Sequence, residues 1–363
     1  MNIAFFGSSL VSSYWNGAAT YYRGLLRALA SLGQTITFYE PDAFDRQQHR
    51  DMPDPPWARV VVYPATHEGW RSALDQAARH ADLIAKASGV GVFDRELEIA
   101  VPELARPGLI TVYWDVDAPA TLDAMAADRG HHLRSVIPLY DFVLTYGGGD
   151  PVVSRYRRFG ARECVPIYNA LDPDTHHPTP ARPEYRCDLS FLGNRLPDRE
   201  ARVDEFFLTP AQLLPRRSFL LGGAGWETKS VPANVRVAGH VGSGSHNAFF
   251  CSGLATLNTN RASMADYGYS PPTRIFEAAG AGACIITDAW KGIELFLEPD
   301  KEILVARDGA AVAGFLEDLT PARAEEIGSA ARARVLAEHT YAHRARRVAD
   351  LLEIASSASE AAE

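Results

Sequence analysis

The stretch that decides the fold is Ser270-Pro-Pro-Thr-Arg-Ile-Phe-Glu-Ala-Ala-Gly-Ala-Gly-Ala-Cys-Ile-Ile-Thr-Asp288. Ser270 is a favourable N-cap residue, and Pro271 suits the first position of a helix. We therefore expect a helix to begin near these two residues and to run over 273–279.

The same stretch also predicts how the helix ends. Gly280 and Gly282 let the chain leave the helix within a few residues, and we expect them to serve packing and turning. The apolar run 284–287 then predicts a strand. A helix that passes so quickly into a strand is typical of an α/β protein.

Outward from this stretch, short apolar runs alternate with helical periodicity along both halves of the chain. Strands are predicted at 3–6, 35–39, 59–63, 83–87, 109–114, 142–145, 189–192, 218–221, 235–238, 254–258, 284–287 and 303–306. Helices are predicted at 18–32, after Asp198, and at 273–279, 321–337 and 342–354. Such alternation predicts parallel sheets with helices on both faces.

Residues 166–186 are rich in Pro, His and Asp and show no sustained periodicity, so they are expected to form a linker. The chain thus divides into a Rossmann-like domain over 1–165 and a second Rossmann-like domain over 187–340. Residues 341–363 are expected to contain a terminal helix. Two doubly wound domains in tandem predict an interdomain cleft at the carboxyl ends of the two sheets.

Composition excludes several classes of protein. The 363 residues carry a net charge of −9, which argues against a nucleic-acid binder. No apolar run approaches the length of a membrane span, and the N-terminus resembles no secretion signal. The four cysteines show no paired spacing, so neither a disulfide nor a metal site is expected. These features favour a cytoplasmic protein.

The stretch 270–288 resembles the donor-binding helix and following strand of GT-B glycosyltransferases, and is closest to the CgeB-like branch related to the retaining family-4 enzymes. Further matches lie at 140–145, 168–173, 257–261, 292–294 and 300–303. The resemblance covers the C-terminal half well and the N-terminal half loosely.

The resemblance implies metal-independent transfer of a sugar from a nucleoside diphosphate sugar, with UDP favoured, to a hydroxyl acceptor. It implies no cofactor, and a terminal helix that packs back on the N-terminal domain. Family-4 enzymes carry two glutamates eight positions apart. The second corresponds to Glu277, but Tyr269 occupies the position of the first. The resemblance therefore assigns no residue of this sequence to the sugar contact that the first glutamate makes in those enzymes.

Arg274 and Glu277 carry the strongest functional signal. A helix N-terminus offers free N–H groups to an anion, and an arginine so close to it is locally disfavoured by the helix dipole. A diphosphate bound between the helix N-terminus and Arg274 would explain why an arginine occupies this position. Glu277 lies one turn on, where the resemblance implies hydrogen bonds to a ribose. Thr273, in the first turn, is included among the expected donor contacts. The alternative is an ordinary surface ion pair.

Other expected donor contacts follow strand ends of the second domain. They are Asn258, Arg261, Gly223, Arg195 and His240. Asn258 and Arg261 are expected to flank the diphosphate or the sugar. Gly223 lies in a glycine-rich loop that also fits a plain turn, and Arg195 is either a phosphate contact or a solvated side chain.

On the acceptor side, Asn16 and Gly17 open the first helix, either next to a ligand or as a plain helix start. Trp114 and Asp115 end a strand that is expected to face the cleft, and Asp117 fits a helix N-cap. Asp115 is the candidate general base if the enzyme inverts, with a structural role as the alternative. If the enzyme retains, the leaving diphosphate can take the proton.

The histidines give weaker signals. His131, His132, His176 and His177 lie in polar, loop-like sequence, so we expect them to be solvated. His246 is expected to begin a helix after a flexible loop at 242–245.

Three rival interpretations remain. Asp115-Val116-Asp117 matches the metal-binding D-x-D of another glycosyltransferase architecture, but such triplets are common by chance. A nucleotide-sugar epimerase would share this fold, and so would a non-catalytic nucleotide- or glycan-binding protein. A dinucleotide dehydrogenase is disfavoured because neither half has G-x-G-x-x-G after its first strand.

Overall fold

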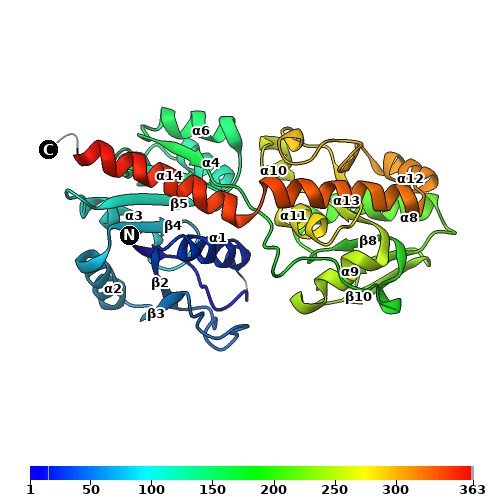
Figure 1. The fold of residues 1–363 in the computed structure, drawn as a ribbon, viewed down its shortest axis with the longest axis horizontal. Helices are drawn as coiled ribbons and strands as arrows, with labels where there is room; N and C mark the ends of the chain where they lie inside the picture. The colour runs from blue at the N-terminus through cyan, green and yellow to red at the C-terminus, as the bar shows by residue number, and fades with distance from the viewer. Residues whose placement is uncertain (15, 361–363) are drawn as a thin grey trace. The chain divides into compact units, whose positions relative to one another are not determined.

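The computed structural model describes residues 1–14 and 16–360, and the chain forms two compact units (Figure 1). Unit 1 comprises Met1–Tyr168 together with Tyr341–Glu363, whose last three residues lie outside the described part. Unit 2 comprises Asn169–Thr340.

Unit 1 is built on a seven-stranded parallel sheet of order β3-β2-β1-β4-β5-β6-β7. The strands are β1 (Asn2–Phe6), β2 (Thr35–Asp42), β3 (Ala58–Pro64), β4 (Leu83–Ala87), β5 (Ile110–Asp115), β6 (Phe142–Thr145) and β7 (Cys164–Pro166). Its helices are α1 (Ala19–Ser31), α2 (His67–His80), α3 (Asp94–Glu103), α4 (Ala118–Ala127), α5 (Leu133–Val136), η1 (Ile137–Leu139), α6 (Gly149–Arg158) and α14 (Tyr341–Glu360).

An aromatic cluster fills the core of unit 1 between the sheet and α1. The Phe5 ring lies 5.2 Å from the Tyr22 ring, 5.5 Å from Phe38 and 5.5 Å from Trp114. Large rings of this kind bury much apolar surface and add favourable edge and offset contacts. Trp114 therefore belongs to the core rather than to a ligand-facing surface.

Helix α14 joins unit 1 from the far end of the sequence and packs against α1. The close approach depends on Gly24 of α1, where an added Cβ would lie 2.2 Å from the Tyr341 ring. Tyr341 also packs edge-on against Tyr21 at 6.1 Å between ring centroids.

Unit 2 is built on a six-stranded parallel sheet of order β10-β9-β8-β11-β12-β13. The strands are β8 (Cys187–Leu192), β9 (Phe219–Gly222), β10 (Val235–Gly239), β11 (Gly253–Asn258), β12 (Ile285–Asp288) and β13 (Leu304–Ala306). The helices are η2 (Pro183–Tyr185), α7 (Pro197–Val203), the π-helical η3 (Asp204–Leu208), α8 (Thr209–Leu213), η4 (Ser243–Ser245), α9 (His246–Ser252), α10 (Ala262–Tyr267), α11 (Thr273–Gly280), η5 (Ile293–Leu295), α12 (Gly309–Asp318) and α13 (Pro321–Glu338).

The sequence prediction of two doubly wound parallel-sheet domains is confirmed. Strand β7 was missed because only three residues pair. One cap prediction is wrong: α11 begins at Thr273 with Pro272 as its N-cap, and the Ser270 hydroxyl donates to the Gly268 carbonyl instead. Pro272 disfavours helical backbone at Pro271, which delays the helix.

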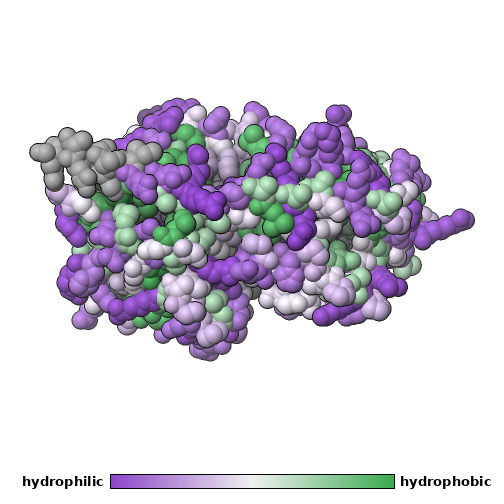
Figure 2. Space-filling view, in the orientation of Figure 1, coloured by the Kyte–Doolittle hydropathy of each residue, from purple (hydrophilic) through white to green (hydrophobic). Residues whose placement is uncertain are grey.

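Figure 2 shows a face on which hydrophilic side chains predominate, with hydrophobic residues scattered between them. Within the described residues, no helix combines the length and the apolar character that a membrane crossing needs. The four cysteines are unpaired, and Cys164 and Cys284 are buried.

Replacing Gly24 by valine should destabilise unit 1, because its side chain would collide with the Tyr341 ring. We expect a loss of about 1–3 kcal/mol in the free energy of unfolding, measured by urea denaturation. Gly314→Ala in α12 is the matched control, since nothing lies within 4 Å of its added Cβ. Unchanged stability in Gly24→Val would show that α14 does not pack as closely as described.

Candidate functional site

The carboxyl ends of β8 and β11 lie side by side, and the strand order of unit 2 reverses between them. Open parallel sheets bind ligands at this position, because the two loops leave the sheet in opposite directions. Loop 193–196 follows β8, and loop 259–261 follows β11. Helix α11 is followed by β12 of the same sheet. Its first turn contains Arg274, which the sequence predicted to contact the donor.

Arg274 and Glu277 form an ion pair one turn apart on α11, as their spacing predicted. The Glu277 side chain is buried, whereas that of Arg274 is 35% exposed. Arg274 Nη1 also lies 3.2 Å from Nδ1 of His246, the first residue of α9. Since a guanidinium can only donate, this Nδ1 accepts, and Nε2–H of His246 donates to the Val241 carbonyl at 3.2 Å.

The pKa values of both Glu277 and His246 are lowered in this group. Burial by itself would raise the pKa of Glu277, but Arg274 and the neighbouring His176 and His246 lower it to about 2. Burial, reinforced by the charge of Arg274, lowers the pKa of His246 to about 4. At neutral pH the group is therefore an ionised carboxylate beside a guanidinium and a neutral imidazole.

His176 completes this group, and the prediction that it is solvated is wrong. The side chain is buried, and its Nε2 lies 3.9 Å from Glu277 Oε1. Gly280 permits this approach, because a Cβ there would lie 2.9 Å from the His176 carbonyl oxygen and 2.3 Å from Leu171. The packing role expected for Gly280 is confirmed, and Gly282 has the left-handed backbone of a turn, with φ of +79°.

His176, His246 and Glu277 are also the residues that could hold a metal ion, since each offers a ligand atom within 4.8 Å of the others. Arg274 works against a cation there. Its guanidinium contacts both Glu277 and the accepting nitrogen of His246, so a metal would have to displace a positive charge.

Arg199 adds positive charge to the same end of unit 2, and sequence reasoning missed it. Burial and the nearby charges of Arg274 and Arg261 lower the pKa of Arg199, partly offset by Asp198. Gly193 leaves room for this side chain, because a Cβ there would lie 3.0 Å from Arg199 Nη1. A signal was present: like Arg274, Arg199 lies in the first turn of a helix, where the dipole disfavours a cation.

Unpartnered buried groups lie in the loop that follows β11. The Thr259 hydroxyl and both side-chain polar atoms of Asn260 are buried without a hydrogen-bond partner among the described residues. Unsatisfied buried polar groups are uncommon in folded proteins, and a water or a ligand can supply the partner. The predicted contact Asn258 is instead occupied within the protein, where its amide donates to the Thr287 hydroxyl at 3.1 Å.

The other predicted donor residues differ in whether their side chains are already paired within the protein. Arg195 donates to both carboxylate oxygens of Glu200, at 2.9 and 2.8 Å, and to Thr228, which favours the structural alternative. Arg261 pairs with Asp198 at 2.5 Å, and Thr273 is the first residue of α11. His240 is exposed after β10.

Gly223 and Tyr269 both have a positive φ, which glycine adopts freely and tyrosine rarely. Gly223 has φ of +121°, and a Cβ there would lie 2.2 Å from the Gly193 carbonyl oxygen, so the glycine lets two loops touch. Tyr269 occupies the place of the missing glutamate with φ of +49°. Its ring packs on Gly292, and the Lys291 ammonium lies 5.5 Å from the ring centroid.

In unit 1, Asp115 is fully buried at the end of β5. Its carboxylate accepts hydrogen bonds from the Tyr156 and Ser88 hydroxyls, the Asp117 backbone N–H and the Thr121 hydroxyl. Burial raises the pKa of Asp115, and these donors oppose the rise. An acceptor hydroxyl could approach only by replacing one of them, so the geometry favours the structural alternative.

The other predicted acceptor residues are also engaged. Trp114 Nε1 donates to the Tyr21 hydroxyl at 3.1 Å. Asp117 is the N-cap residue of α4, although its side chain makes no capping bond. Asn16 is buried, accepts from Ser8 at 2.7 Å and donates to two backbone carbonyls, while Gly17 is exposed. The structure thus shows Asn16 organising its own loop.

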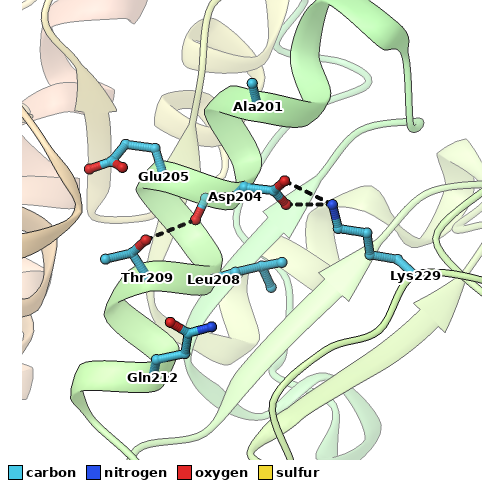
Figure 3. A pocket seen from close by; sticks show the side chains of 7 residues that line it. All are labelled: Ala201, Asp204, Glu205, Leu208, Thr209, Gln212 and Lys229. Carbon is cyan, nitrogen blue, oxygen red and sulfur yellow. Dashed lines mark hydrogen bonds and ion pairs between the residues drawn. The ribbon is translucent and has the colours of Figure 1, made fainter.

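A separate hollow lies along α7, η3 and α8 and contains none of the predicted site residues. Figure 3 shows Lys229 reaching the Asp204 carboxylate across it, and the Thr209 hydroxyl donates to the Asp204 carbonyl at 3.2 Å. Pro210 lacks the N–H that an α-helix would need, which accounts for the π-helical turn here.

Comparison with known proteins agrees with this architecture. Residues 199–350 match the model of a family described as glycosyl transferase-like, whereas no curated protein matches the sequence. Sucrose-phosphate synthase from Thermosynechococcus elongatus is 15% identical with a TM-score of 0.69, and the match covers 99% of this chain and 100% of that one.

Two further solved structures were determined with UDP-glucose. HepE from Anabaena is 14% identical, with a TM-score of 0.66 and coverage of 97% of this chain and 99% of its own. An alpha-glucosyltransferase, solved with UDP-glucose and DNA containing an abasic site, is 11% identical, with a TM-score of 0.70 and the same coverage.

Fold and family match together define the class: the chain is a glycosyltransferase with the GT-B fold. Residues 199–350 match the CgeB-like, glycosyl transferase-like family, in agreement with the resemblance of the stretch 270–288.

Asp115→Asn tests the structural role. An amide nitrogen in place of one oxygen would face hydroxyl and N–H donors, so we expect the free energy of unfolding to fall by about 1–3 kcal/mol. Urea denaturation measures this, with the exposed Asp123→Asn as control. Affinity for a nucleoside diphosphate should not change. Normal stability with lost sugar transfer would instead favour the general base.

His246 should make the protein less stable in mild acid. Because its folded-state pKa of about 4 lies below the usual 6.5, the unfolded chain binds a proton that the folded chain does not. Stability is therefore present above about pH 6.5 and is lost as pH falls toward 4. Urea denaturation at pH 7 and pH 5 should show a smaller loss for His246→Phe than for wild type. Equal losses would contradict the buried, neutral imidazole.

Proposed function

We propose that this protein transfers a sugar from a UDP-sugar to a hydroxyl acceptor without a metal ion. The observation that carries the proposal is the pairing of Arg274 with buried Glu277 at the N-terminal turn of α11. The UDP-glucose complexes of HepE and of the alpha-glucosyltransferase, which share the fold, support the choice of donor.

In this proposal the diphosphate binds at the N-terminus of α11, where free N–H groups and Arg274 neutralise it. Arg199 and Arg261 strengthen the positive field. The unpartnered groups of Thr259 and Asn260 bind oxygens of the diphosphate or the sugar. Glu277 accepts hydrogen bonds from the ribose.

Transfer forms a bond between the acceptor oxygen and the anomeric carbon, and breaks the bond from that carbon to the diphosphate. The diphosphate leaves with the electron pair of the broken bond. Its charge is stabilised by fixed positive groups that need no reorganisation, which takes the place of a metal ion. With Asp115 enclosed, we propose that the departing diphosphate takes the acceptor proton.

Thermal stabilisation by UDP, GDP and dTDP, with and without EDTA, tests the donor site. Ligand that binds only the folded state raises the melting temperature. UDP should raise it regardless of EDTA. The Arg274→Ala variant should bind UDP on the order of tenfold or more weakly, because a charged hydrogen bond is lost. Arg216→Ala, which removes an exposed arginine of unit 2, should bind UDP normally.

Two results would contradict the proposal. If no diphosphate stabilises the protein, the donor site is wrong, and a non-catalytic role becomes the better account. If stabilisation requires a divalent metal, the metal-free mechanism is wrong.

A further inference from the structure

His176 is the most unusual polar group beside the proposed donor site. It lies only seven residues after the chain enters unit 2 at Asn169, in a segment whose composition gave no functional signal. Its side chain is more than nine-tenths buried, yet its Nε2 has no hydrogen-bond partner among the described residues. Leaving a buried nitrogen unpaired costs stability, so a function is the natural explanation.

The fold holds His176 firmly in place. A turn precedes it, in which the His176 N–H donates to the Asp172 carbonyl at 3.0 Å. The side chain of Asn247 in α9 makes two hydrogen bonds to this turn. Its N–H donates to the Thr175 carbonyl at 2.9 Å, and its oxygen accepts from the His177 N–H at 3.3 Å. On the other side, Gly280 of α11 admits the His176 backbone. The imidazole is therefore fixed between two helices.

The unpartnered nitrogen faces Glu277. Its 3.9 Å separation from Glu277 Oε1 is too long for a direct hydrogen bond, while Arg274 holds the other carboxylate oxygen. A ligand hydroxyl placed beside the two atoms could bridge them, because a hydroxyl both donates and accepts. A protonated Nε2 can donate to a hydroxyl that in turn donates to Glu277. A bare Nε2 can accept from one hydroxyl of a neighbouring pair while Glu277 accepts from the other.

We propose that His176 is a specificity-determining residue that binds the ribose diol together with Glu277, so that the protein takes ribonucleoside diphosphate sugars and rejects deoxyribose analogues. The proposal rests on the donor site described above. A site built to hydrogen-bond a hydroxyl discriminates strongly against a ligand that lacks it, because buried polar groups are then left unpaired.

A metal ion is the rival occupant of the same three residues. The guanidinium of Arg274 contacts two of them and would repel a cation. A sugar diol is neutral, so Arg274 would not repel it.

The test compares UDP, 2′-deoxy-UDP and 3′-deoxy-UDP by calorimetric titration of the full chain, with GDP and its deoxy forms in their place if GDP is the diphosphate bound. Wild type should bind at least one deoxy form about tenfold or more weakly than the parent nucleotide. His176→Phe, which keeps a ring but no nitrogen, should bind UDP more weakly than wild type and should lose most of the discrimination between UDP and that deoxy form.

His177→Phe is the matched control, since this neighbouring histidine is exposed. Its selectivity should equal that of wild type. His176→Asn, which restores a polar group of smaller size, should regain part of the discrimination. Melting temperatures without ligand verify that each variant is folded.

Four results would overturn the proposal. Wild type that binds UDP and both deoxy forms equally would refute the role of His176 but leave the donor site standing. The same holds if His176→Phe keeps full discrimination, or if Zn²⁺ alone stabilises wild type but not His176→Phe. Failure of wild type to bind any diphosphate would refute the donor site and this inference together.

Discussion

The burial of one carboxylate governs the arrangement of unit 2 at its proposed donor end. Glu277 is 5% exposed, and a buried charge is tolerated only when it is paired and hydrogen-bonded. Arg274 provides the pair from the same helix, and the surrounding histidines from α9 and from the segment after Asn169 enclose it. The conformations of three separate segments of the chain therefore depend on one charge.

Close backbone approaches make this arrangement possible. Gly280 admits the segment that carries His176, and Gly223 allows the loops after β8 and β9 to touch. Because a Cβ at either position would collide with a backbone oxygen, glycine is required by geometry rather than by ligand contact. The loops at the switch point of the sheet thus pack tightly, and charged side chains such as Arg199 can gather there.

The two units differ in how buried polar residues at their candidate sites are hydrogen-bonded. In unit 1, Asp115 and Asn16 are hydrogen-bonded by neighbouring groups of the same unit. In unit 2, Thr259, Asn260 and His176 are buried with unpartnered atoms among the described residues. The unpartnered atoms of these three residues lie in the unit that carries Arg274 and Glu277, which supports the proposal that the donor binds in unit 2.

The sequence by itself determined the two doubly wound sheets, the helix with Arg274 and Glu277, and the resemblance to the family that residues 199–350 match. Hydrophobic periodicity and helix spacing are local, and a pair three residues apart on a helix must share a face. Only the tertiary structure decided that His176 is buried against Glu277, that Arg199 approaches Arg274 and that Asp115 is enclosed. These facts depend on contacts between segments distant in the chain, where burial and partner geometry, and not residue type, set the role of each side chain.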